Sequence, residues 1–154
     1  NEDRHGRPTT PKIEESCRDV LIEILRPDLY PLGIALEPEG HMAADKRADI
    51  VALLPPTKIV CELKRDVHAD VWTAAESQLA RLYTPDPDAS GYGLYIVFWF
   101  GTRRQARLPA PTGGQAPDSA TAMESMLVSG LSDDTRKRIA VIVLDVSGEL
   151  TPGS

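Results

Sequence analysis

The order of apolar and polar positions along the chain predicts alternating helices and strands. A first helix is expected from Pro11 to about Leu25, because apolar side chains recur there at helical spacing and Pro27 follows. A second helix is expected over Asp70–Tyr83 and a weaker third from Ser119 to about Leu131. The predicted strands are Gly33–Leu36, Ala48–Leu54, Lys58–Lys64, Tyr92–Phe100 and Ile139–Val146. This order predicts an α/β fold in which a central mixed sheet is flanked by helices.

The second and third predicted strands form a hairpin that carries charged residues in an apolar setting. Asp49 lies on the first arm, and Glu62 and Lys64 lie on the second, after a proline-containing turn. Strand side chains alternate between faces, so Glu62 and Lys64 share one side with Val60. Cys61 lies on the other side, and we expect it to face away from the charged residues into the core.

The length of the chain fits one domain. We expect residues 1–10 to form a disordered N-terminal segment, residues 11–147 to form the domain, and residues 148–154 to form a C-terminal tail. Residues 101–118 form a Pro/Gly-rich loop of unusual length for a compact domain, which predicts that the loop is either mobile or functional.

The bulk charge and the hydropathy pattern exclude two classes of protein. A formal net charge of −6 argues against a protein that coats nucleic acid non-specifically, because phosphate contacts need positive surface. The chain has no run of about 18 apolar residues, so we expect neither a membrane-spanning helix nor a membrane partner. Cys17 and Cys61 both fall in apolar patterns and are expected to be free thiols, which fits the cytoplasm.

The charged residues of the hairpin suit the hydrolysis of phosphodiester bonds. Two like charges in close proximity are unfavourable unless a cation lies between them, and Asp49 and Glu62 could hold Mg²⁺ or Mn²⁺. A bound metal neutralises phosphate charge and activates water. A lysine one pleat from Glu62 is placed to orient or deprotonate that water and to offset charge in the transition state, which makes Lys64 a catalytic candidate.

Asp49, the hairpin turn and the sequence Glu62-Leu63-Lys64 together resemble the signature of the PD-(D/E)XK nuclease superfamily. The predicted element order is also similar to the αβββαβ core of that restriction-endonuclease-like fold, over nearly the whole chain. The resemblance implies that Asp49, Glu62 and the backbone carbonyl of Leu63 are metal ligands and that Lys64 is catalytic. Ala48 stands where the motif has proline, which changes no ligand.

The resemblance implies two further site residues on the helices. Members of the superfamily often carry a metal-binding glutamate on the first helix, where Glu14, Glu15 and Glu23 are candidates. Glu14 is the choice because it lies roughly 60° from the centre of the apolar face, nearer than Glu15 or Glu23; the alternative is a plain solvated acid. Gln78 points toward the sheet from the second helix and is the candidate catalytic glutamine, or else a core-edge amide bonded to nearby backbone.

Four residues are candidate contacts for nucleic acid. Basic side chains in pairs or near the hairpin could meet phosphates, and the same groups could equally be solvated surface or ion-pair partners. His68 follows the hairpin closely and could assist there, although a capping role is the simpler interpretation. The candidates are Arg65, His68, Arg103 and Arg104.

These features predict a Mg²⁺- or Mn²⁺-dependent DNA endonuclease domain. We expect it to act as the effector module of a larger bacterial protein in defence, including antiviral defence, or in repair, with other domains of a longer parent chain as partners. Cutting both strands would favour a homodimer. The alternatives are a catalytically inactive nucleic-acid-binding or scaffold domain on the same fold, and an unrelated α/β domain whose hairpin carries a surface ion pair.

Overall fold

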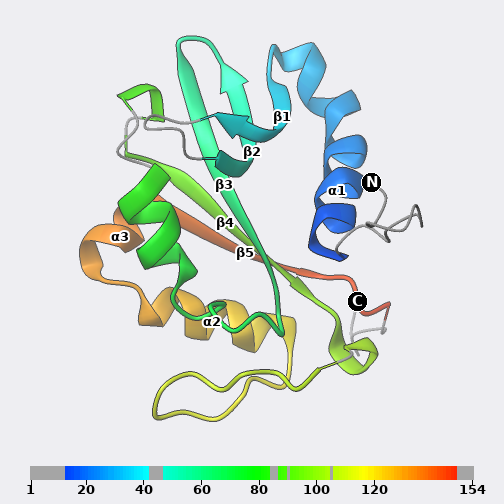
Figure 1. Ribbon diagram of the computed structural model, residues 1–154, viewed down its shortest axis with the longest axis vertical. Helices are drawn as coiled ribbons and strands as arrows, with labels where there is room; N and C mark the ends of the chain where they lie inside the picture. The colour runs from blue at the N-terminus through cyan, green and yellow to red at the C-terminus, as the bar shows by residue number, and fades with distance from the viewer. Residues whose placement is uncertain (1–12, 42–46, 84–86, 90, 105, 149–154) are drawn as a thin grey trace, which may run out of the picture.

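One five-stranded mixed sheet organises the part of the chain that the computed structural model describes, which is residues 13–41, 47–83, 87–89, 91–104 and 106–148. The strands follow the order β1-β2-β3-β4-β5, with β1 to β3 antiparallel and β3 to β5 parallel (Figure 1). Their bounds are β1 Ala35–His41, β2 Arg47–Leu54, β3 Thr57–Arg65, β4 Gly93–Trp99 and β5 Ile139–Asp145. The predicted α/β class with a central mixed sheet is therefore confirmed. The predicted segment 1–10 and all of the predicted tail except Gly148 lie outside the described residues.

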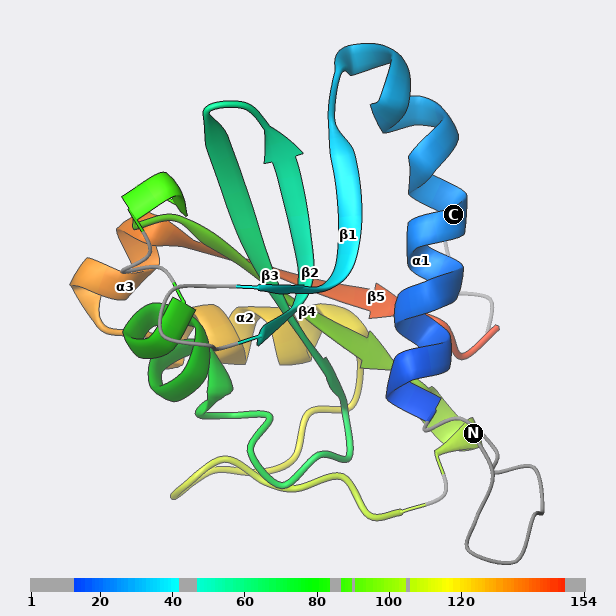
Figure 2. The same ribbon diagram turned by 45° about the horizontal axis from the view of Figure 1, so that its top comes forward.

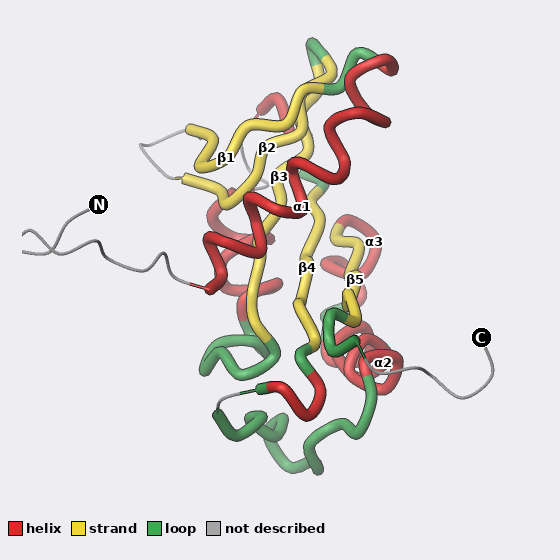
Figure 3. The backbone as a smooth tube through the Cα atoms, turned by 90° about the vertical axis from the view of Figure 1, so that its right-hand side faces the viewer, coloured by secondary structure: helices red, strands yellow, loops and turns green. Residues whose placement is uncertain are grey.

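Helices cover both faces of this sheet. Helix α1, Ile13–Leu29, lies on one face, where Ile22 packs with Cys61 and Leu63 of β3; Figure 3 looks onto this helix in front of the strands. The opposite face carries a π-helix, Ala75–Tyr83, and helix α2, Ala120–Gly130. Their side chains pack there in a larger core with Val60, Leu79, Tyr95, Val97, Met123 and Leu127. The residues of β3 thus alternate between two cores, as the apolar pattern predicts.

The first helix runs further than its sequence suggests. Pro27 lies inside the last turn of α1 instead of stopping it, and the chain continues into a short 3₁₀ turn, Tyr30–Leu32. Proline lacks the N–H that would bond to the carbonyl four residues earlier, and in the last turn this loss affects only the end of the helix. Gly33 ends the turn at φ 79°, a left-handed conformation that suits glycine, and donates its N–H to Tyr30 O at 3.0 Å.

The first strand also extends into a segment that looks like a polar loop. In place of the predicted Gly33–Leu36, β1 covers Ala35–His41 and pairs with β2 along that length (Figure 2). This strand lies at the edge of the sheet, where polar side chains can face solvent while the backbone is paired on one side. Pairing with β2 therefore overrides the polar character of the sequence.

The second helix and the region before β5 differ from their predictions. Residues 66–73 form turns, and the regular helix over Ala75–Tyr83 is of the π type, whose turns contain more residues than those of an α-helix. A short helix, α3, covers Asp133–Arg138 and is absent from the predicted elements. The Ser132 side chain caps it by accepting the N–H of Thr135 at 3.2 Å.

No helix among the described residues is both long enough and apolar enough to cross a membrane. Cys17 and Cys61 are free thiols, and both belong to the core under α1. Burial, followed by the negative charge of Asp49, raises the pKa of Cys61 to about 12, so this thiol stays protonated at neutral pH.

Candidate active site

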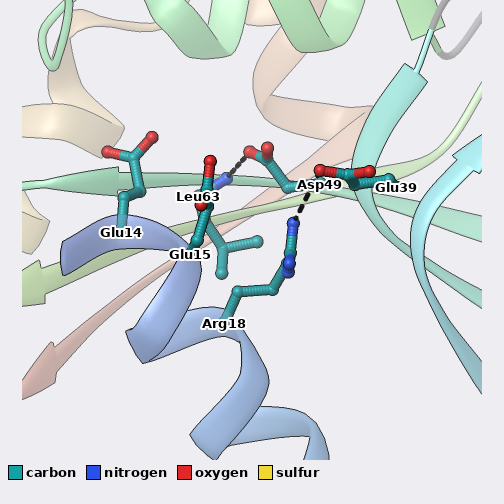
Figure 4. Close-up of a pocket in the computed structure, with 6 residues that line it drawn as sticks. All are labelled: Glu14, Glu15, Arg18, Glu39, Asp49 and Leu63. Carbon is teal, nitrogen blue, oxygen red and sulfur yellow. Dashed lines mark hydrogen bonds and ion pairs between the residues drawn. The ribbon is translucent and has the colours of Figure 1, made fainter. Parts of the chain in front are cut away.

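Asp49 lies where β2 and β3 stop pairing. The paired register of the two strands ends at Ile50 and Cys61. At the next position, the Oδ2 atom of Asp49 accepts the backbone N–H of Leu63 at 2.8 Å (Figure 4). The carboxylate thus occupies the place of the next backbone carbonyl in the ladder, which fixes it against the strand that carries Glu62 and Lys64.

The neighbouring strand β1 is distorted opposite Asp49. Glu39 has a φ of 50°, in the left-handed region that a residue with a Cβ adopts at a cost of about 1 kcal/mol. A Cβ at the next residue, Gly40, would lie only 2.2 Å from the Cγ2 atom of Val51, so the two strands approach closely there. Ala48 and Val51 contribute to the same core although they are three residues apart, so side-chain alternation shifts at Asp49.

Glu62 and Lys64 form a buried ion pair. Their side chains are only 4% and 7% exposed, and Lys64 Nζ donates to Glu62 Oε1. Glu62 is paired in register with Tyr95 of β4, so both charged residues lie on the face covered by the π-helix and α2. The predicted shared side of Glu62, Lys64 and Val60 is confirmed, and so is the placement of Cys61 in the opposite core.

The surroundings of this pair perturb both charges. Burial, aided by the charge of Asp49, raises the pKa of Glu62 to about 7, although Lys64 works in the opposite direction. Burial alone would lower the pKa of Lys64, but the carboxylates, with Glu62 first, outweigh it and raise the pKa above its ordinary value. Lys64 is therefore an ammonium group at neutral pH.

Glu14 reaches β3 from the first turn of α1. Its Oε2 atom accepts the backbone N–H of Arg65 at 3.2 Å, two residues beyond the N–H that Asp49 holds. Glu14 and Asp49 line a pocket of about 180 Å³ between α1 and the strands, and Figure 4 shows both carboxylates directed toward the strand that carries Leu63. The other residues that line this pocket are Glu15, Arg18, Glu39 and Leu63.

The carboxylates of this site suit a hard divalent cation in their chemistry. Oxygen donors of this kind are the preferred ligands of Mg²⁺ and Mn²⁺. Within the described ranges, however, no three His, Cys, Asp or Glu side chains converge to hold a metal ion. Glu62 is bonded to Lys64 on one face of the sheet, whereas Glu14 comes from α1 on the other. Glu62 would have to turn away from Lys64 to share a metal with Asp49.

The structure does not place Gln78 or Glu23 with these residues. Gln78 is half-buried on the π-helix and does not line the pocket. Its predicted orientation assumed α-helical spacing, which a π-helix does not have. Glu23 lies two turns after Glu15 on α1 and forms an exposed ion pair with Arg26 at 2.6 Å.

The four candidate nucleic-acid contacts lie near the carboxyl ends of β3 and β4. Arg65 is half-buried at the end of β3, and His68 Nδ1 accepts the backbone N–H of Asp70 at 3.1 Å in the following turn. Arg103 is exposed in the 3₁₀ turn after β4. They share one end of the sheet, as expected for residues that follow parallel strands.

Arg104 is committed to contacts within the protein. Its guanidinium pairs with the fully buried Asp66 at 3.1 Å and stacks at 4.4 Å over the ring of Trp99. Asp66 also accepts the backbone N–H of Phe100 at 3.0 Å, which connects the ends of β3 and β4. The loop that contains Pro109 is also anchored, because Trp72 Nε1–H donates to Pro109 O at 2.9 Å. These contacts account for Arg104 without a bound nucleic acid.

Two residues that line the pocket, Arg18 and Glu39, are absent from the site residues predicted from the sequence, and Glu15 was an alternative to Glu14 there. Glu15 precedes Arg18 on α1, and Glu39 reaches the pocket from β1. A signal for Arg18 was available, because it follows Glu14 by four residues and so lies on the same side of the helix. Glu39 lies beyond the strand predicted over Gly33–Leu36, and it reaches the pocket because β1 extends to His41.

No protein-family model matches this chain, and no match was found among curated proteins or solved structures. The site's own residues and contacts therefore carry the functional inference.

Proposed function

We propose that this chain is a Mg²⁺- or Mn²⁺-dependent nuclease that hydrolyses phosphodiester bonds of DNA. The observation that carries the proposal is the attachment of two acids to one short stretch of β3. Asp49 accepts a hydrogen bond from the N–H of Leu63, and Glu14 accepts one from the N–H of Arg65. The buried Glu62–Lys64 ion pair belongs to the same stretch. Side chains from three separate segments thus meet around the sequence that resembles the nuclease signature.

The charge balance at this stretch favours a cation. Burial and the charge of Asp49 hold the pKa of Glu62 near 7, so its ionised form is poorly compensated even beside Lys64. Asp49, Glu62, Glu14 and the backbone carbonyl of Leu63 would hold the metal. When bound, the metal would neutralise phosphate charge and lower the pKa of a coordinated water.

Of the roles that the sequence suggests for Lys64, the stabilisation of negative charge fits the structure better than the deprotonation of water. Its raised pKa keeps it protonated, so it does not deprotonate water in the metal-free protein. If Glu62 turned toward a bound metal, the Lys64 ammonium would be available to stabilise negative charge on the phosphate. We therefore assign it electrostatic stabilisation in preference to general-base catalysis.

The order of elements also supports the proposal. A helix, three antiparallel strands, a helix and a parallel strand come in the order of the proposed restriction-endonuclease-like αβββαβ core, and α2, α3 and β5 follow them. The proposed setting remains an effector module of a larger bacterial defence or repair protein. DNA, other domains of that parent and a second copy of the chain are its proposed partners.

Plasmid cleavage tests the function directly. The chain and its Asp49→Ala and Lys64→Ala variants are incubated with supercoiled plasmid, single-stranded DNA or RNA in Mg²⁺, Mn²⁺ or EDTA. We expect metal-dependent nicking or cutting of DNA that falls at least about 100-fold in either variant. Glu23→Ala removes an acid from the same helix as Glu14, outside the pocket, and should leave the rate unchanged. Cleavage that persists in EDTA or in Asp49→Ala would refute the proposal.

A second candidate function follows from the lack of a converged ligand group among the described side chains. A catalytically inactive domain on the same fold would bind nucleic acid without needing a metal. The two candidates differ in thermal stability, because Mn²⁺ at 100 times its Kd stabilises the folded state by about 2.7 kcal/mol. A melting temperature that Mn²⁺ raises in the wild-type chain but not in Asp49→Ala favours the nuclease. DNA binding with no effect of Mn²⁺ favours the inactive domain.

A further inference from the structure

Arg18 brings a positive charge into the acidic pocket. It lies one helical turn after Glu14 on α1, and its side chain is only 13% exposed. Figure 4 shows its guanidinium beside Glu39, in the same pocket as Glu14 and Asp49. Four carboxylates line this pocket, and Arg18 is the one cationic residue among the described residues that line it.

Two ion pairs hold Arg18 in place without using all of its donors. Its Nη1 atom pairs with Glu39 at 3.3 Å, while its Nε and Nη2 atoms face Asp19 at 2.9 Å. A guanidinium has five N–H groups in a planar fork, so these contacts leave donors for a further ligand. Glu39 itself lies in the distorted stretch of β1 opposite Asp49. The same local backbone thus positions both the metal-binding candidate and the partner of Arg18.

A phosphate in this pocket needs a cation besides the metal. The phosphodiester carries a negative charge and would meet the carboxylates of Glu14, Glu15, Glu39 and Asp49. Lys64 is bonded to Glu62 and does not line this pocket, so it could offset phosphate charge there only after Glu62 has turned away from it. Arginine binds phosphate oxygens with two parallel N–H bonds, which suits it to this task.

We propose that Arg18 binds the non-bridging oxygens of the scissile phosphodiester and so positions it against the carboxylates of the site. This inference rests on the proposed nuclease function and assigns its site a substrate-binding residue. The guanidinium would exchange its contact with Glu39 for the phosphate, and Glu39 would remain one of the acids that line the pocket. Arg18 thus strengthens the binding of the substrate and weakens the binding of the metal, because it competes with the metal cation for the same carboxylates.

This dual role gives Arg18→Ala two effects of opposite sign. We expect kcat/KM for a duplex oligonucleotide in Mn²⁺ to fall about 10- to 100-fold, mostly through KM, because a charge-assisted phosphate contact is lost. The affinity for Mn²⁺ alone, measured by isothermal titration calorimetry, should stay equal or increase, because a positive charge leaves the acidic pocket. Arg18→Lys retains the charge but not the fork, so its KM should lie between those of the wild type and Arg18→Ala.

Arg26→Ala is the matched control. Arg26 lies two turns further along α1 and is also ion-paired, with Glu23, but it is outside the pocket. It should change neither KM nor Mn²⁺ affinity. Because Arg18 and Arg26 are both ion-paired arginines of α1, the control separates a local effect from a general effect of lost positive charge on DNA binding.

The outcomes separate this inference from the function on which it rests. If the wild-type chain cuts DNA and Arg18→Ala cuts with the same KM, the role of Arg18 is refuted while the nuclease function stands. If Arg18→Ala loses Mn²⁺ affinity and activity together, or if Arg18→Lys restores nothing, Arg18 is structural and the inference is also refuted. A wild-type chain that neither binds Mn²⁺ nor cuts DNA refutes the proposed function and this assignment together.

Discussion

Replacing Gly40 by alanine would place a carbon atom inside the van der Waals volume of Val51. The new Cβ would lie 2.2 Å from Val51 Cγ2 and 2.7 Å from Val51 Cβ. Val51 is only 2% exposed and is β-branched, so it can neither move into solvent nor rotate freely. Overpacking of this kind costs typically 1–3 kcal/mol, and we expect about 3 kcal/mol here because the clash involves a stiff side chain. For a chain of this size, about 2–4 °C per kcal/mol predicts a fall in Tm of roughly 6–12 °C.

Urea and thermal unfolding of Gly40→Ala measure this cost. Gly130→Ala is the control, because a Cβ at Gly130, the last residue of α2, would have nothing within 4 Å. It should change the free energy of unfolding by less than about 1 kcal/mol, with stabilisation the expected direction. The strands that Gly40→Ala pushes apart also place Asp49, so the stabilisation by Mn²⁺ should shrink in that variant. If Gly40→Ala unfolds within about 2 °C of the wild type, the close approach of β1 and β2 is not as described.

Two further predictions concern buried charges. Burial, aided by the charge of Asp49, raises the pKa of Glu62 from its ordinary 4.5 to about 7, so this group favours the folded state at low pH. Its contribution is lost as pH rises from about 4.5 through about 7, with a slope of at most about 1.4 kcal/mol per pH unit. In Asp49→Asn, the Tm measured in EDTA should fall less steeply between pH 5 and 8 than in the wild type. An equal dependence on pH would contradict the effect of Asp49 on the pKa of Glu62. Arg104→Ala leaves the fully buried Asp66 carboxylate without its cation and should lower the free energy of unfolding by about 3 kcal/mol, the low end for a buried pair because Arg104 is partly exposed. In urea unfolding, the double variant with Asp66→Asn should lose less than the sum of the two single variants, and strict additivity would show that the pair is not coupled.

Most of the strands could be predicted because their apolar residues report directly on burial. The strand predicted over Tyr92–Phe100 is apolar on both faces, and the structure places β4 in the sheet between β3 and β5, under helices on each side. β1 could not be delimited, because its polar residues gain their strand conformation from pairing with β2. The short α3 carried a readable signal in Ser132 and in the acidic start and basic end of the segment, but it has no apolar stripe.

The placement of the site residues could also be predicted only in part. Period-two alternation correctly placed Glu62 and Lys64 on one side and Cys61 on the other. The sequence could not say that the charged side is itself covered, because the helix above it comes from a later segment of the chain. Gln78 depended on a helical period that the π-helix does not follow. The pocket residues from α1 and β1 required the packing of those elements, which no local pattern encodes.

The hydrogen bond from Leu63 to Asp49 makes the backbone a reporter on the site. The Leu63 N–H is donated at 2.8 Å to a carboxylate, and the side chain of Leu63 is completely buried. A cation on Asp49 would draw electron density from that carboxylate and weaken the bond it accepts. In an NMR spectrum the resonance of the Leu63 amide proton should therefore move upfield as Mg²⁺ is added to the wild-type chain. Occupancy of the site would then be visible in the unmodified chain, without cleavage and without a substrate.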